Sequence, residues 1–220
     1  YHVVSYAGDN FLGGDDIDAA IADIIRNQIV ERGGVIGPDD HRLAFELLDK
    51  AEQVKKALSG GAETSAVIIP GACRKKDGSL VDVDLEITRE QFAEVLGPFE
   101  ARITKLLQEY LRREGLDPTQ ITEVLMVGGS SAIPAIQELL RGIFEPDGKP
   151  RVKLARRPMD AVALGAAIYG EMIGGILCPK CGAENPVDAK KCAACGEEEL
   201  QMARFAPRGG SQDGVVSAQL

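Results

Sequence analysis

Apolar and polar residues follow two different spacings along this chain, and together they predict a mixture of helix and sheet. Strict alternation over residues 80–87 predicts a strand with one face in water, and residues 64–70 predict its partner in a hairpin. Apolar residues three and four positions apart predict helices over residues 17–29, 41–59 and 88–115. The pattern is typical of an α/β protein.

Shorter signals mark where these elements begin and end. Thr88 with Gln91 forms a capping box that opens a helix, and Gly115 predicts the end of that helix.

Three charges on the polar side of the 41–59 helix are expected to lie in solvent: Glu52, Lys55 and Lys56. Four further features are expected: the end of a strand at residues 2–7, a kink at Gly97-Pro98, a short strand at 151–154, and a helix opened by Pro158 whose small residues 161–167 pack closely on its neighbours.

One stretch, residues 123–134, combines a strand, a glycine turn and a helix start. The run from Val124 to Val127 is typical of a parallel strand buried on both faces, and a helix with Pro134 in its first turn follows Gly128-Gly129 directly. Glycines let a ligand approach the backbone, and a helix N-terminus favours an anion such as phosphate. A turn that uses its glycines only for close packing is the alternative.

Composition narrows the class of protein. The 220 residues are 45% hydrophobic but only 5% aromatic, with no Trp, which favours the aliphatic core of a layered α/β protein. The formal net charge of −9 makes nucleic acid and anionic membranes poor partners. No apolar run reaches the length of about 18 residues that spans a bilayer, and no signal peptide is evident, so we expect a cytoplasmic protein. The start without Met indicates a piece of a longer polypeptide.

Two Cys-x-x-Cys pairs near the C-terminus predict a metal site. Each pair, Cys178/Cys181 and Cys192/Cys195, is followed by Gly, which allows the positive φ of a turn that aims both thiolates at one tetrahedral zinc ion. Two disulfides or a redox pair are the alternatives, but a cytosolic setting disfavours the first and the doubled pattern the second. We expect a zinc ribbon over residues 176–199, an ordinary thiol at Cys73, and a disordered, Gly-rich tail over residues 200–220.

Five blocks of sequence occur in an informative order: Gly8-Asp-Asn-Phe-Leu-Gly-Gly-Asp-Asp-Ile-Asp18, Glu52-x-x-Lys-Lys-x-Leu-Ser59, Ile87-Thr-Arg-Glu90, Val127-Gly-Gly-Ser-Ser-Ala-Ile-Pro134 and Asp160-Ala-Val-Ala-Leu-Gly-Ala-Ala167. Together they resemble the second half of the ATPase domain of the seventy-kilodalton heat-shock chaperones. The resemblance implies an actin-like fold in which residues 1–175 form lobe II, a layered sheet with flanking helices and a smaller α+β subdomain over about residues 15–88. In that family ATP or ADP lies between two lobes, with magnesium in the full-length protein.

The resemblance also implies a role for individual residues. Glu52 and Lys55 match positions that bind the ribose hydroxyls, Lys56 matches one that covers a face of adenine, and Ser59 matches one at the adenine edge. The remaining matches line the cleft or support the nucleoside and first phosphate: Gly13, Gly14, Gly128, Gly129 and Ser130. Two positions depart from the family, since Ala132 replaces an arginine that stacks on adenine and Met159 replaces an aspartate.

Two functions stay open at this point. In the family the first lobe supplies the catalytic groups, so we expect the parent chain to be an ATPase and residues 1–220 alone to be inactive. The first function is a nucleotide-binding lobe that regulates a protein partner recognised through the zinc ribbon, and the second is a non-catalytic scaffold that no longer binds nucleotide. Sugar kinases share the fold, but the helix with Glu52, Lys55, Lys56 and Ser59 favours the chaperone branch.

Overall fold

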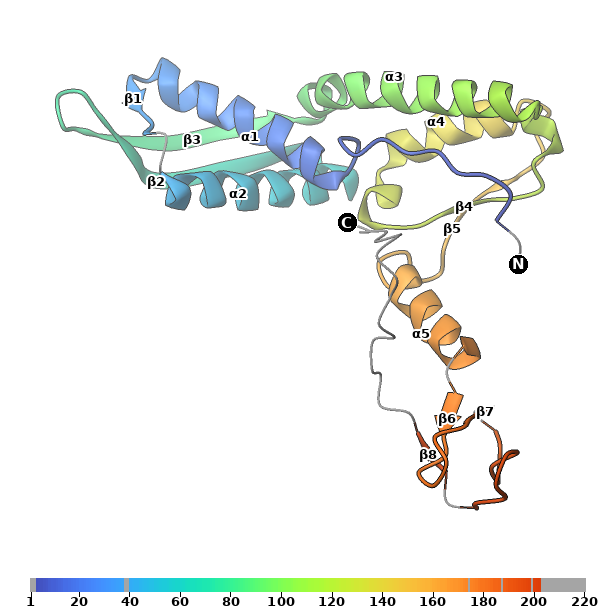
Figure 1. Cartoon of the computed structure of the whole chain (residues 1–220). Coiled ribbons are helices and arrows are strands. Elements are labelled where there is room, and N and C mark those ends of the chain that lie inside the picture. The colour runs from blue at the N-terminus through green and yellow to red at the C-terminus, as the bar shows by residue number, and fades with distance from the viewer. Residues whose placement is uncertain (1–2, 38–39, 174, 187, 199, 203–220) are drawn as a thin grey trace. The chain divides into compact units, whose positions relative to one another are not determined.

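The computed structural model describes residues 3–37, 40–173, 175–186, 188–198 and 200–202 (Figure 1). The chain divides into two compact units, Tyr1–Ala161 and Val162–Leu220. The sequence placed the domain boundary after residue 175, and that boundary stays a prediction. Among the described residues, none of the helices combines the length and the apolar character that crossing a membrane requires.

Three antiparallel strands and two helices form the N-terminal part of the first unit. β2 (Thr64–Lys75) pairs with β3 (Leu80–Thr88) on one edge and with the short β1 (Gly34–Val35) on the other. α1 (Gly14–Glu31) and α2 (His41–Ser59) pack against each other and on the strands (Figure 1). The predicted hairpin and the first two predicted helices are therefore confirmed.

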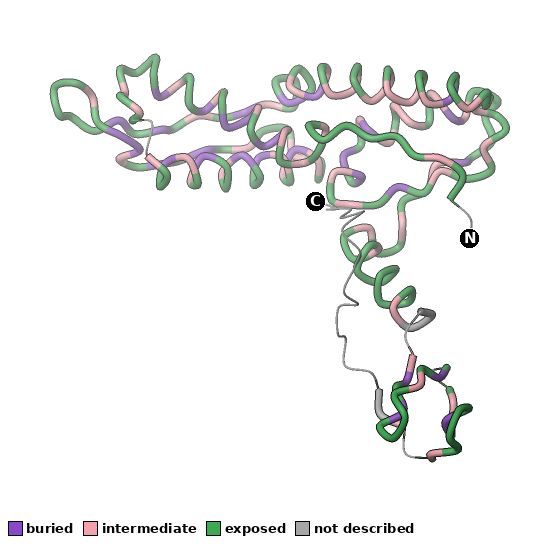
Figure 2. Tube along the Cα trace, viewed as in Figure 1, coloured by how far each residue is buried: buried purple, intermediate pink, exposed green. Residues whose placement is uncertain are grey.

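The alternation of side chains decides which face of this sheet is buried. Val81, Val83 and Ile87 are at most 3% exposed. The intervening acidic residues, Asp82, Asp84 and Glu86, lie in solvent (Figure 2). Because successive side chains of a strand point to opposite faces, this sequence can bury one face only, as predicted.

The third helix, α3 (Arg89–Glu114), begins and ends where the sequence predicts. Its capping box is made in both directions, since Gln91 N donates to Thr88 Oγ1 at 3.3 Å and Thr88 N donates to Gln91 Oε1 at 2.9 Å. Gly115 closes the helix with a left-handed φ of 65°, which favours glycine. Pro98 lies inside the helix, and the kink expected there stays a prediction.

A two-stranded parallel sheet follows α3. β4 (Val124–Met126) pairs with β5 (Val152–Leu154), and α4 (Pro134–Phe144) connects them. The expectation that β4 is buried on both faces is wrong, because Leu125 is 59% exposed while its neighbour Met126 is 7% exposed. Only the Met126 side of the strand meets the hydrophobic core, which is continuous with that of the first sheet.

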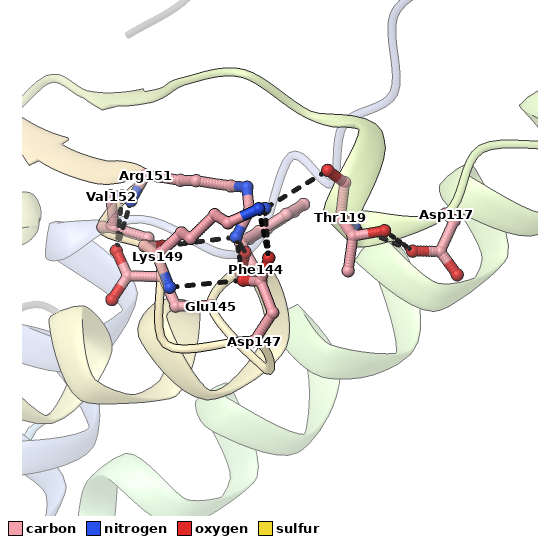
Figure 3. Close-up of polar contacts among 8 residues, drawn as sticks. All are labelled: Asp117, Thr119, Phe144, Glu145, Asp147, Lys149, Arg151 and Val152. Carbon is pink, nitrogen blue, oxygen red and sulfur yellow. Dashed lines mark hydrogen bonds and ion pairs between the residues drawn. The ribbon is translucent and has the colours of Figure 1, made fainter.

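A buried arginine fixes the loop between α4 and β5 (Figure 3). The side chain of Arg151 is 8% exposed, and its guanidinium donates to both carboxylate oxygens of Asp147 at 2.5 and 2.8 Å. It also donates to the carbonyl oxygens of Phe144 and Thr119, at 3.1 and 3.3 Å. These hydrogen bonds hold the pKa of Asp147 well below its usual value. The cluster ties the end of α4 and the 3-10 turn at Pro118–Gln120 to the start of β5.

The second unit contains one helix and a small sheet. α5 (Ala161–Ile173) precedes β6 (Gly175–Leu177), which pairs antiparallel with β7 (Glu184–Pro186) and with β8 (Gln201–Met202). β8 lies inside the stretch predicted as a disordered tail, and residues 203–220 of that tail lie outside the described residues. The helix expected to open at Pro158 begins at Ala161, and the close packing expected of its small side chains is not observed in the part of the chain that the structure describes, since residues 162–169 are all exposed.

The strand expected at residues 2–7 is not observed. Residue 2 lies outside the described residues, and residues 3–7 have no regular structure. Val3, Val4 and Tyr6 are 79%, 85% and 86% exposed. A strand is stabilised by pairing with a neighbour, and in the described part of the chain this segment is held by side chains instead, with Arg113 donating to Tyr6 O at 2.9 Å.

Candidate functional site

Three segments that are distant in sequence converge at the N-terminus of α1. A Cβ atom added to Gly14 would lie 2.8 Å from Ser130 Oγ and 3.3 Å from Lys55 Nζ. Gly14 opens α1, Lys55 lies on α2, and Ser130 lies in the turn after β4. Only a residue without a side chain fits between the other two, so the close approach of α1 to Lys55 and Ser130 requires glycine at this position.

Lys55 is not in solvent, contrary to the sequence prediction. Its ammonium nitrogen is 2.5 Å from Asp18 Oδ2, and the two side chains are only 13% and 9% exposed. The packing of α1 on α2 buries this ion pair. Burial raises the pKa of Asp18 and outweighs the opposite effect of Lys55, and Asp18 Oδ1 is a buried oxygen without a hydrogen-bond partner among the described residues.

Lys55 keeps donor capacity for a ligand. An ammonium group has three N–H donors. One points to Asp18 Oδ2 at 2.5 Å and another to Gly14 O at 3.1 Å. The third has no acceptor among the described residues, so an oxygen of a ligand such as a sugar hydroxyl could accept it.

The glycine turn after β4 has a conformation that requires glycine. Gly128 has a φ of 86°, its N–H donates to Pro158 O at 2.8 Å, and its carbonyl oxygen accepts from Ser131 Oγ at 2.5 Å. The helix does not start directly after the glycines, because a 3-10 turn at Gly129–Ala132 comes first. The buried Ile133, 2% exposed, forces this offset by entering the core before Pro134 begins α4.

Met159, one of the departures from the family, lies against the turn. Its Sδ is 3.0 Å from the Cβ position of Gly129, although 73% of the Met159 residue surface is exposed. The thioether therefore covers part of the backbone at which the sequence predicted phosphate binding.

A pocket of about 340 Å³ lies between the end of α2 and the first turns of α3 and α4. Ser59, Ile133 and Pro134 line it, with Arg89 and Glu138. Ser59 Oγ is buried and has no hydrogen-bond partner among the described residues. A buried hydroxyl without a partner costs free energy, so a polar ligand edge that bonds to it would be stabilised.

The other predicted nucleotide residues are more exposed. Glu52 and Lys56 pair with each other at 2.7 Å on the outer side of α2, with side chains 48% and 68% exposed. The hydrogen bond from Lys56 lowers the pKa of Glu52. Gly13 N donates to Asp16 Oδ2 at 2.7 Å and so belongs to the cap of α1. Ala132 is exposed, and no side chain there can stack on a base.

The four predicted metal ligands form one cluster in the second unit. The sulfur atoms of Cys178, Cys181, Cys192 and Cys195 all lie within 4.8 Å of one another. Two pairs are closer, with Cys178 and Cys195 at 3.5 Å and Cys181 and Cys192 at 3.6 Å. Zn–S bonds of about 2.3 Å place the sulfurs of a tetrahedral site about 3.8 Å apart, so this donor set fits zinc. All four thiols are free, which disfavours the disulfide alternative.

Both turns of the cluster use the same backbone pattern. Gly182 N donates to Cys178 O, and Gly196 N donates to Cys192 O, both at 2.9 Å. These glycines have φ values of 70° and 77°, as the sequence predicts. Burial raises the pKa of the Cys192 thiol, but hydrogen bonds from the backbone N–H groups of Cys195 and Ala194 and from the Asn185 side chain lower it to about 6. A backbone hydrogen bond from Glu197 lowers the pKa of the Cys195 thiol, but the neighbouring Cys181 sulfur and burial outweigh it and raise that pKa to about 12. Cys192 therefore ionises more readily than Cys195.

Comparison with known protein families identifies the first unit and the start of the second. The family described as Hsp70 protein matches residues 1–182 of the chain. The chain belongs to the Hsp70 family. Hsp70 proteins have an actin-like ATPase fold, so the predicted fold class is confirmed. The family match indicates that the first unit is a nucleotide-binding, ATPase-like region. The match ends at Gly182, inside the first Cys-x-x-Cys segment.

Sequence reasoning missed Asp18 and Asn185. Asp18 lies on the buried face of α1, four residues before Ala22 and seven before Ile25. An acidic residue at the spacing of the apolar face was the signal that could have indicated a buried carboxylate. Asn185 lies between the two cysteine pairs without any pattern of its own, so only the structure could show what it contacts.

Proposed function

We propose that residues 1–220 form the adenosine-binding lobe of an Hsp70-type ATPase and carry a structural zinc ribbon. The observation that carries the nucleotide part is the convergence of Gly14, Lys55 and Ser130 at the N-terminus of α1. A ribose hydroxyl bound beside these groups would supply an acceptor for the third N–H of Lys55. The family match supports an ATPase-like role for the same unit.

The adenine end of the ligand belongs in the pocket beside Ser59. The unpartnered Ser59 hydroxyl offers both a donor and an acceptor to a base edge, and Ile133 gives the pocket an apolar wall. In this arrangement the exposed Lys56 covers the base from α2 and Glu52 approaches the ribose. Gly13, Gly128, Gly129 and Ser130 support the nucleoside and the first phosphate, and magnesium belongs to the full-length parent.

The four-cysteine cluster holds zinc and provides folding free energy for the ribbon over residues 176–199. About 25 residues cannot bury a core of useful size, so a bound metal is the main source of stability for such a segment. The ribbon is then a rigid surface that can recognise a protein partner. A reducing compartment such as the cytoplasm keeps these thiols available, and we place the protein there.

A second candidate function is supported by Ala132 and Met159. Ala132 removes a stacking cation, and Met159 covers the Gly129 backbone. Both changes favour a scaffold that has lost its nucleotide and uses the ribbon as its working part.

Titration with ADP separates these two functions. We expect residues 1–220 to bind ADP with a dissociation constant in the high micromolar range or above, because half of a cleft gives fewer contacts for the same ordering cost. The combined variant Asp18→Leu and Lys55→Met removes the ammonium without leaving a buried carboxylate, and it should weaken binding about tenfold, as loss of a charge-assisted hydrogen bond does. Lys105→Met is the control, since this exposed lysine of α3 has the same charge. Absence of NMR shift changes up to about 5 mM ADP, well above the expected dissociation constant, would favour the scaffold.

A further inference from the structure

The buried side chain of Asn185 contacts both halves of the four-cysteine cluster. Asn185 is 3% exposed and lies in β7, directly opposite Ile176 of β6. Its Nδ2 donates to Ala183 O at 3.0 Å, just after the first Cys-x-x-Cys turn. Its Oδ1 accepts from Ala193 N at 2.8 Å, inside the second turn. One amide group therefore links the two turns that would have to hold a single metal ion.

The same amide reaches a ligand sulfur. Asn185 Nδ2 lies 3.6 Å from Cys192 Sγ and 3.5 Å from Ile176 O. A primary amide has two N–H donors. The first is used by Ala183 O, so the second is shared between the sulfur and the Ile176 carbonyl. Cys192 is itself 2% exposed, which leaves little access for water to replace this donor.

We infer that Asn185 is a positioning residue of the metal centre that tunes it through the Cys192 thiolate. This inference rests on the proposed zinc site. Its N–H donor withdraws charge from the sulfur, and its carbonyl oxygen fixes the orientation of the second turn, so that the four sulfurs are held at the spacing that zinc requires before the ion arrives. Groups that hydrogen-bond to metal ligands typically contribute 10–100-fold in metal affinity.

Two substitutions separate the effect on the sulfur from packing. Asn185→Asp keeps the shape and the oxygen that accepts from Ala193 N, but it removes the N–H donors to Cys192 Sγ, Ala183 O and Ile176 O and adds a negative charge beside them. Asn185→Ala removes all four contacts. Lys190→Gln is the matched control, because it changes the net charge of the ribbon by the same amount at an exposed position.

The measurements are zinc affinity by chelator competition and the absorption spectrum of the cobalt(II)-loaded protein. We expect both Asn185 variants to bind zinc about 10–100-fold more weakly and the control to match the unaltered chain. In fully cobalt-loaded Asn185→Asp, the sulfur-to-metal charge-transfer band should move to longer wavelength, because a thiolate without its donor gives up charge more easily.

Each other outcome counts against the inference. Unchanged affinity with an unchanged band would show that Asn185 only fills space. Weaker binding with an unchanged band in the fully loaded variants would assign Asn185 to folding alone. If the unaltered chain binds no zinc, both the zinc proposal and this inference fail. Metal analysis of the unaltered chain distinguishes this outcome from the first two.

Discussion

The buried ion pair between Lys55 and Asp18 makes the stability of the first unit sensitive to loss of the single Lys55 ammonium group. Lys55→Met keeps most of the side-chain volume but leaves the Asp18 carboxylate, 9% exposed, without its cation. Breaking a buried pair by removing one partner costs about 3–5 kcal/mol. For a unit of this size, each kcal/mol lowers Tm by about 2–4 °C, so the expected loss is about 6–20 °C.

The pH dependence of this variant follows from the pKa of Asp18. Burial already raises that pKa above 3.8, and the nearby Glu52 and Asp15 carboxylates add to the effect. Without Lys55 the pKa rises further, so the folded protein holds a proton that the unfolded chain releases. Stability therefore falls as pH rises from about 4 through the folded-state pKa. The deficit of Lys55→Met should be smaller at pH 5 than at pH 8.

A double-mutant cycle tests the reasoning by urea unfolding followed by circular dichroism. Because replacing both members of a buried pair by apolar residues is often neutral, Asp18→Leu combined with Lys55→Met should recover most of the stability that Lys55→Met loses. Lys56→Met is the control, since the Lys56–Glu52 pair is exposed and its loss should leave the urea midpoint unchanged. Additive losses in the double variant, or a Lys55→Met variant as stable as the unaltered chain, would refute a buried, coupled pair.

Three further predictions concern the nucleotide site and the ribbon. Gly14→Ala should weaken ADP binding, because the new Cβ would displace Ser130 Oγ and crowd Lys55 Nζ, and calorimetry that finds equal affinity would contradict a ligand there. In the full-length parent, Ala132→Arg should tighten ADP binding about fivefold, or about 1 kcal/mol, by restoring a stacking cation at an exposed position, and unchanged affinity at unchanged Tm would favour the scaffold. The purified chain should carry about one zinc ion, and Cys181→Ser should unfold residues 178–196 without melting the first unit, as effects at separate sites usually add; intact-mass data showing two disulfides would exclude the metal.

Local patterns in the sequence determined much of this protein because their physical causes act within a few residues. Alternation fixed which face of β3 is buried, and the Thr88–Gln91 box and Gly115 fixed both ends of α3. Each Cys-x-x-Cys-Gly turn closes on itself through hydrogen bonds inside one turn, so its spacing predicted both the positive φ and the clustering of four thiols.

Only the tertiary structure decided features that depend on residues distant in sequence. Lys55 has a polar-face position on its own helix, and it is buried because α1 brings Asp18, 37 residues away, to its ammonium. Leu125 lies in an apolar run that is typical of a strand buried on both faces. It is exposed because only one side of the β4–β5 pair meets the core. Asn185 carries no local signal, and its contacts with both cysteine turns exist because β6 and β7 place it between them. Burial and hydrogen bonding of these side chains are properties of packing, which periodicity along one segment does not encode.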